Sequence, residues 1–180
     1  LVESSKSGKG QVIDAAMTDG SALLMTMMYG MLSAGQWKDQ RDSNLLDGAA
    51  HFYGCYECKD NKYISIGSIE PQFYASLIKC MELDETTFYN QFDQKQWPEL
   101  KKLVSERFKT RTRDEWCEIF MGKDVCFAPV LSLQESVNYE HNQDRQTFVE
   151  IAGINQPAPA PRFSRTESEV KHPPLKVGSN

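Results

Sequence analysis

Apolar and polar residues alternate in two short segments near the middle of the chain. Residues 52–58 and 63–66 place apolar side chains at about every second position, and the polar residues 59–62 separate them. A period of two is typical of a strand with one buried face, and a short polar segment between two such strands is typical of a turn. We therefore predict a β-hairpin over residues 52–66.

Apolar residues recur at helical spacing in the two segments that follow, 71–81 and 98–108. Each segment begins with a proline, which the first turn of a helix tolerates because the missing N–H would have no partner there. A Thr-x-x-Glu pattern at residues 112–115 resembles a capping box, in which a hydroxyl and a carboxylate each satisfy a free backbone amide. The pattern predicts a third helix through residues 116–120.

A short apolar segment at residues 126–131 reads as a strand that contains Pro129. Proline cannot donate to a central ladder, so this strand is expected at the edge of a sheet. A further helix is expected from Leu133 or Gln134. These elements together predict a small α+β domain over residues 48–150.

The segments on either side of this domain differ from it in pattern. Residues 11–14 read as a short strand, residues 15–31 as one long Met-rich helix, and residues 37–47 as a polar connector. A strand so near the first residue would be an unpaired edge, so we expect further sequence upstream of it. Residues 151–180 read as a return connector, and the Pro-rich run within it is expected to stay extended and unpaired.

Composition narrows the classes of function. With 40% hydrophobic and 25% charged residues, the chain is typical of globular proteins. Its net charge of -5 and scattered basic residues argue against a nucleic-acid partner. The apolar stretch at residues 15–32 is interrupted by polar residues and glycines, so it predicts neither a membrane span nor a signal peptide.

Five cysteines, an odd number, do not describe a disulfide framework and favour a reducing compartment. Cys55 and Cys58 form a CxxC pair, but no second pair lies at zinc-ligand spacing, so we predict no metal site and interpret them as apolar strand positions. The sequence also lacks a phosphate-binding glycine loop and the common hydrolase motifs.

The candidate chemistry lies at the end of the first connector. Asp47 precedes Gly48, where a glycine bend lets backbone amides approach a ligand and holds a carboxylate in a defined pose. A plain turn is the alternative interpretation of this pair. His51, four residues after Asp47, is interpreted as a surface histidine, with tuning of Asp47 as the alternative.

Several motifs in consecutive order resemble those of the α-methylacyl-CoA racemases, a branch of the family III (CaiB/BaiF) CoA-transferases. The resemblance covers residues 6–165, and GKGQV on its own is common to the wider family. The motifs are GKGQVID at residues 8–14, NLLDG at 44–48, GSIEPQFY at 67–74, APVL at 128–131 followed by Glu135, and PAPRF at 159–163.

The resemblance implies a fold and a reaction. Residues 1–36 would be the last strand and helix of a large α/β nucleotide-fold domain, residues 48–150 the small domain, and the whole protein an interlocked homodimer. The reaction would be a 1,1-proton transfer at the α-carbon of a 2-methylacyl-CoA thioester through an enolate. It would use no cofactor, since CoA is part of the substrate. Its location would be the cytoplasm, or the mitochondrion or peroxisome of a eukaryote.

The resemblance also implies roles for individual residues. Asp47 matches the catalytic aspartate, and Glu135 resembles the glutamate that pairs with a catalytic histidine, which belongs to sequence upstream of this chain. Gly48, Met25 and Met28 are assigned to substrate binding, with core packing as the alternative for the methionines. A carboxylate that transfers protons near neutral pH would need a raised pKa.

The chain departs from the family pattern beside Asp47. The racemases usually read Asp-Gly-Gly-Ala-Pro, whereas this chain has Ala49 and His51 in place of the second glycine and the proline. A CoA-transferase that acts through an aspartyl thioester, and a non-catalytic interaction domain with the small-domain fold, are the alternative functions. The chain by itself is expected not to racemise an acyl-CoA.

Overall fold

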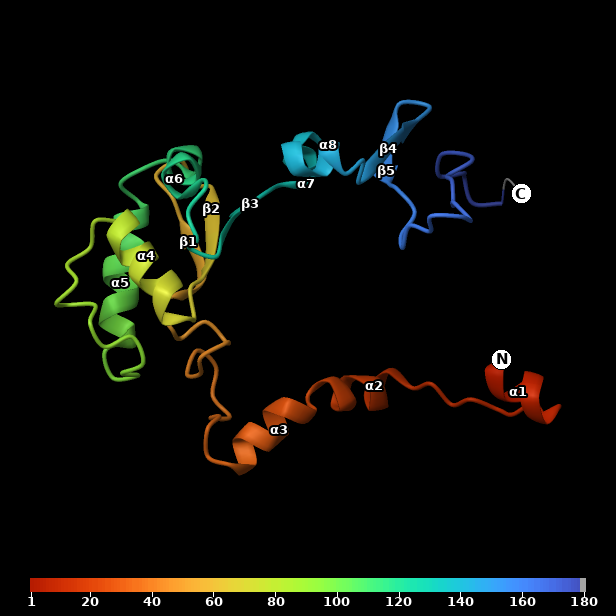
Figure 1. Ribbon diagram of the computed structural model, residues 1–180, viewed down its shortest axis with the longest axis horizontal. Coiled ribbons are helices and arrows are strands. Elements are labelled where there is room, and N and C mark those ends of the chain that lie inside the picture. Colours follow the sequence, from red (N-terminus) through yellow and green to blue (C-terminus); the bar gives the residue numbers. More distant parts are fainter. Residues whose placement is uncertain (179–180) are drawn as a thin grey trace.

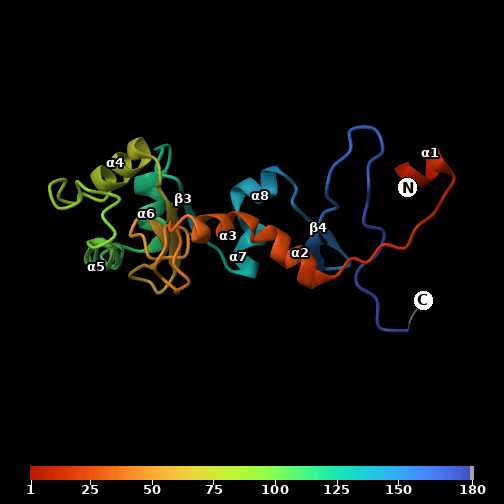
Figure 2. The same ribbon diagram turned by 90° about the horizontal axis from the view of Figure 1, so that it is seen from below.

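The computed structural model describes residues 1–178 and contains one packed domain with an arm at each end (Figure 1). Within those residues, all the buried hydrophobic side chains lie between Ala50 and Val125. The core therefore falls inside the segment 48–150, where the α+β unit was predicted, and the mixed α+β class is confirmed. Both arms extend from the same side of the domain (Figures 1 and 2).

The predicted hairpin supplies two strands of a three-stranded antiparallel sheet, and its second strand is the central one. β1 (Tyr53–Glu57) pairs with β2 (Tyr63–Gly67), with Cys55 opposite Ser65. β3 (Phe127–Val130) pairs with the other side of β2, so the sheet has the order β1-β2-β3. The prediction that the Pro129 strand lies at an edge is confirmed.

Three helices pack against this sheet at the positions that the apolar pattern predicted. They are α4 (Pro71–Cys80), α5 (Trp97–Phe108) and α6 (Arg113–Phe120). The capping box before α6 is present: the Thr112 hydroxyl accepts the Glu115 amide, and the Glu115 carboxylate accepts the Thr112 amide. Both reciprocal bonds satisfy amides that would otherwise have no partner.

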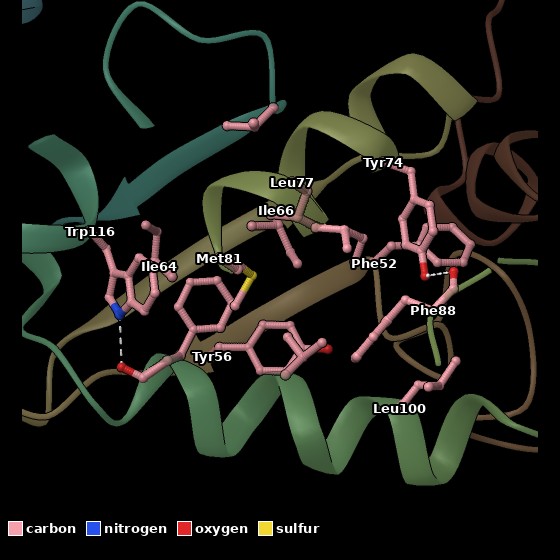
Figure 3. Packing of buried hydrophobic residues seen from close by; sticks show 14 of the residues in the cluster. Phe52, Tyr56, Ile64, Ile66, Tyr74, Leu77, Met81, Phe88, Leu100 and Trp116 are labelled. Carbon is pink, nitrogen blue, oxygen red and sulfur yellow. Dashed lines mark hydrogen bonds between the residues drawn. The ribbon is translucent and has the colours of Figure 1, made fainter. Parts of the chain in front are cut away.

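Aromatic side chains fill the space between the sheet and the helices (Figure 3). Tyr56 of β1 stacks on Phe108 of α5, with ring centroids 5.1 Å apart, and Trp116 of α6 meets the edge of Phe108 at 5.3 Å. The Trp116 indole also donates to the Phe108 carbonyl at 2.8 Å. Phe108 thus joins strand β1 to two helices that are adjacent in sequence.

The N-terminal arm differs from its prediction. It contains α1 (Val2–Ser7), α2 (Met17–Leu24) and α3 (Thr26–Ser33), and none of the three buries a residue. Residues 11–14 belong to no strand, because no neighbouring strand offers them hydrogen bonds. The expected single helix is broken at Met25, since no packing stabilises a continuous helix that carries two glycines.

The C-terminal arm contains two short helices and a second hairpin. The helix expected near Leu133 is α7 (Leu133–Asn138), and α8 (Glu140–Asp144) follows it. β4 (Phe148–Ile151) then pairs with β5 (Ile154–Pro157). The expectation that the Pro-rich run stays unpaired is wrong for Gln156 and Pro157, which pair with β4. Pro157 is tolerated because it is the last residue of a two-stranded ladder, where its missing N–H leaves no ladder bond unmade.

The central position of Phe108 generates a stability prediction. Phe108→Ala is expected to lower the free energy of unfolding by about 3–5 kcal/mol, because it removes a fully buried ring and leaves a cavity beside Trp116. Tyr89→Ala is the matched control, because the Tyr89 ring is exposed and its loss should cost less than about 0.5 kcal/mol. Urea unfolding followed by tryptophan fluorescence measures both. Equal effects of the two substitutions would contradict this account of the core.

Candidate functional site

The Asp47 carboxylate closes a tight turn at the end of the first connector. Its Oδ1 accepts the Asn44 amide at 2.8 Å and the Ala49 amide at 3.4 Å. Its Oδ2 accepts the Asn44 side-chain Nδ2 at 2.7 Å and the Ser43 amide at 3.2 Å. Four donors from its own loop therefore hold the carboxylate in one orientation.

These donors decide the protonation state of Asp47. Partial burial raises the pKa of the carboxyl. The hydrogen bonds from Asn44, Ser43 and Ala49 together lower it by more than burial raises it, so the pKa lies below its ordinary value of 3.8. A hydrogen bond to the charged form stabilises that form. The raised pKa that proton transfer near neutral pH would need is therefore not present in this chain, and Asp47 is ionised at neutral pH.

Gly48 has the unusual backbone angle that the bend requires. Its φ is 103°, and a Cβ there would lie 3.2 Å from Oδ1 of Asp42. Its carbonyl accepts the Lys101 ammonium from α5, which ties the turn to the packed domain. A cavity of about 440 Å³ lies beside the turn, where connector and α5 meet. Its lining residues are Lys38, Asp42, Ser43, Ala49, Gln94, Trp97, Pro98 and Lys101.

The Glu135 carboxylate is occupied by other partners. Both of its oxygens bind the Arg113 guanidinium, at 2.9 and 3.0 Å, and Oε1 also binds Lys62 at 2.9 Å. Oε2 accepts the Ser132 amide at 3.0 Å as part of the capping box of α7. Arg113 first, and then the Ser132 amide and Lys62, hold the pKa of Glu135 well below its usual range.

The structure does not bring Glu135 to Asp47. All the partners given above for Glu135 come from β2 and its turn, α6 and the start of α7, and α7 follows β3 away from the connector in Figure 1. The Arg113 side chain is buried, with only 5% of the residue exposed. The Ser-x-x-Glu pattern at residues 132–135 is a local signal for the capping box of α7. No local signal indicates that Arg113 binds the same glutamate.

Met25 and Met28 lie on the N-terminal arm, away from the Asp47 turn. Met25 is exposed at the break between α2 and α3, and Met28 is half-buried. The core-packing alternative is not realised either, because neither helix contributes a buried residue. The described chain thus assembles only Asp47 and Gly48 of the five residues predicted for the site.

His51 is fully buried, which corrects its interpretation as a surface residue. Its Nε2 lies 2.7 Å from the Tyr74 hydroxyl, and that hydroxyl donates to the Phe88 carbonyl at 3.0 Å. Since the hydroxyl has one proton and the carbonyl only accepts, Nε2 must carry the ring proton. Nδ1 is buried without a partner, and burial lowers the pKa of His51 to about 4.

The cysteines offer no metal or redox centre in residues 1–178. Cys55 is exposed and Cys58 is buried, all five thiols are free, and no cluster of potential metal ligands is found. Burial raises the pKa of the Cys58 thiol to about 11, so it is not a reactive thiolate at neutral pH. No helix in the same range is long and apolar enough to cross a membrane.

Comparison with known proteins identifies the family. The model of "CoA-transferase family III" matches residues 1–180. The chain belongs to this family. It is 41% identical to the alpha-methylacyl-CoA racemase of Mus musculus and 40% identical to that of Homo sapiens, in each case over 92% of this chain and 44% of the relative. The chain therefore spans less than half the length of these curated relatives.

Solved structures support the family III fold. Rv3272 from Mycobacterium tuberculosis matches 99% of this chain with a TM-score of 0.71 at 16% identity, and the match covers 47% of that protein. A CAIB/BAIF family protein from Brucella suis matches 97% of this chain with a TM-score of 0.66 at 18% identity, over 47% of its own length. Because both identities are low, these matches describe the fold alone.

Burial of neutral His51 generates a pH prediction. The unfolded chain binds a proton on this ring near pH 6.5 and the folded chain only near pH 4, so stability is full above pH 6.5 and falls as the pH drops through this window. The loss is expected to reach about 3 kcal/mol at pH 4.

Unfolding by urea between pH 7.5 and 4 tests this expectation. Glutamine in His51→Gln keeps a side-chain donor for Tyr74 but does not titrate. The free energy of unfolding of this variant should therefore fall less over the same pH range than that of the unsubstituted chain. His141→Gln, at an exposed histidine of α8, should behave like the unsubstituted chain. If His51→Gln and His141→Gln give the same pH dependence, buried His51 is not its source.

Proposed function

We propose that this chain supplies one of the two acid/base groups of a 2-methylacyl-CoA racemase, and that the group is Asp47. The proposal is supported most by the two racemase relatives, whose similarity extends across nearly the whole chain, including the turn that contains Asp47. In this reaction one base removes the α-proton of the thioester, and an acid on the opposite face returns a proton to the enolate. Sequence beyond this chain supplies the second group.

The Asp47 turn is suited to the deprotonation step. The carboxylate is ionised before substrate binds, which is the state that a base needs, and four donors fix its direction. Its low pKa makes it a weak base in this chain alone. Closure of the site by the rest of the protein would exclude water and raise that pKa towards the working range.

Gly48 keeps the turn tight enough for a substrate to approach, and Lys101 steadies its carbonyl. Glu135 enters the proposal as an anchor for α7, because Arg113, Lys62 and the Ser132 amide fill its acceptor positions. A role beside a catalytic histidine would require the exposed Lys62 contact to open first.

Transfer of CoA between carboxylic acids is the second candidate function. A succinyl-CoA:glutarate CoA-transferase from Homo sapiens is 25% identical over 97% of this chain. Both functions use an acyl-CoA thioester and no further cofactor, and both are compatible with an interlocked homodimer of the longer protein. The free cysteines fit the proposed reducing compartment, the cytoplasm or a mitochondrion or peroxisome.

The test uses a chimera in which this chain replaces the matching segment of the mouse racemase. Exchange of the α-proton of 2-methylacyl-CoA with D₂O, followed by mass spectrometry, measures the reaction. Asp47→Asn is expected to lower exchange by about 10²–10⁴-fold, because it removes the proton carrier and keeps the shape. Binding of the CoA ester, measured by calorimetry, should change little.

Asp39→Asn is the matched control, since Asp39 is an exposed carboxylate of the same connector. It should retain exchange within about twofold. Exchange by Asp47→Asn at the unsubstituted rate would contradict the assignment of Asp47. A folded chimera that moves CoA from succinyl-CoA to a carboxylic acid, but exchanges no α-proton, would favour the transferase.

A further inference from the structure

A cavity of about 550 Å³ opens on the packed domain, and none of its lining residues belongs to the Asp47 turn or to either arm. It is formed by the C-terminal half of α4, the turn between α5 and α6, and the end of α6 with the loop that follows. Three of its lining residues are basic: Lys79, Arg111 and Lys123. A cavity of this size can hold a small molecule.

The Arg111 side chain is held by an aromatic ring instead of a carboxylate. Its guanidinium lies over the Trp116 ring, 5.6 Å from the centroid, and the residue is half-buried. The Arg107 guanidinium lies over the same ring at 5.7 Å, but it donates to the Met81 carbonyl and pairs with Glu82. Within residues 1–178, the Arg111 side chain has no hydrogen bond or ion pair. Stacking therefore fixes the guanidinium while its donors stay free for a ligand.

The two lysines do not serve as hydrogen-bonding caps of the helices beside them. Lys79 lies in the last turn of α4 and Lys123 follows the end of α6, where a lysine often binds free carbonyls. Backbone amides already fill this role, at 3.1 Å on the Lys79 carbonyl and 3.0 Å on the Phe120 carbonyl. In the described part of the chain, neither ammonium group makes a hydrogen bond or ion pair. Both charges are therefore available to the cavity.

Positive charge exceeds negative charge around the cavity. Two carboxylates, Glu82 and Asp124, also line it. Glu82 is paired with Arg107, which is outside the lining, so its charge is already compensated. Among residues 1–178, the three basic side chains of the lining thus face one carboxylate without an ion pair, Asp124. Like charges that share a cavity repel one another, and an anionic ligand would relieve that repulsion.

We propose that the cavity between α4 and α6 binds the diphosphate group of a small molecule, with Arg111 as the residue that orients it. A stacked guanidinium presents a rigid fork of donors that matches two phosphate oxygens, and lysine binds phosphate as a point charge. A carboxylate has two oxygens in one plane, whereas a diphosphate has oxygens on two tetrahedral centres and can meet cations from three chain segments. This binding site goes beyond the racemase chemistry and does not depend on it.

Calorimetric titration of the 180-residue chain with inorganic pyrophosphate, and separately with ADP, tests the site. The unsubstituted chain is expected to bind one pyrophosphate, and more weakly as NaCl rises, because salt screens the cations. Arg111→Gln should raise the Kd by about tenfold, because a charge-assisted, two-bond contact is lost. Tighter binding of ADP than of pyrophosphate would identify a nucleotide as the ligand, and equal binding would show that the diphosphate alone is recognised.

Lys102→Gln is the matched control, since Lys102 is an exposed lysine of α5 outside the cavity and its loss changes the net charge equally. It should change the Kd by less than about twofold. Arg111→Gln also removes a cation from the Trp116 face, so Lys123→Gln, at an exposed lysine, is measured beside it and should weaken binding several-fold without touching the core. Equal effects of Lys102→Gln and Lys123→Gln would overturn the proposal, because binding would then follow net charge alone.

An NMR titration locates the bound pyrophosphate. The largest changes are expected in the amide signals of residues 79–82, 111 and 119–124. Changes centred on Lys38 and Lys101, which line the cavity beside the Asp47 turn, would overturn the assignment, as would the absence of binding at millimolar pyrophosphate. Neither measurement involves an acyl-CoA, so the outcome is independent of α-proton exchange by the chimera.

Discussion

Burial of aromatic rings between the hairpin and three helices is the interaction on which this structure depends. Phe108 stacks on Tyr56 and meets Trp116, so one side chain joins the sheet to α5 and α6. Within residues 1–178, the arms contribute no buried side chain to this core. Their conformation is therefore set by local hydrogen bonds and turns, whereas that of the domain is set by packing.

The Asp47 turn lies where the N-terminal arm, which is held by local contacts, meets the packed domain. On one side, Lys101 of α5 holds the Gly48 carbonyl, and Ala50 and His51 are already fully buried. On the other side, the connector is held mainly through Asn44. The Asp47 carboxylate is therefore held in one orientation and stays half-buried rather than enclosed in the core.

The two carboxylates that the sequence analysis singled out are held by different kinds of partner. Glu135 is bound by Arg113 and Lys62 and anchors the start of the C-terminal arm, so its charge is neutralised within this chain. Asp47 is held by neutral donors and keeps its negative charge.

Much of the domain was predictable from the sequence. The strands of the hairpin, the proline starts of α4 and α5, and the capping box before α6 depend on residues close together in the chain, so their patterns suffice. The same holds for Asp47 and Gly48, whose turn is local. The long N-terminal helix and its preceding strand were mispredicted because apolar periodicity does not state whether a packing partner is present.

The remaining features were decided by tertiary structure alone. His51 looks polar in the sequence, yet it is buried because the Tyr74 hydroxyl, from a later segment, accepts its ring proton and in turn donates to the Phe88 carbonyl. Arg113 binds Glu135 across 22 residues of sequence, a pairing that no local pattern indicates. The sequence by itself determined where the helices, strands and turns of the packed domain begin, because neighbouring residues control them. Which charges and polar groups meet was left to the fold, because those partners are brought together only when the distant segments pack.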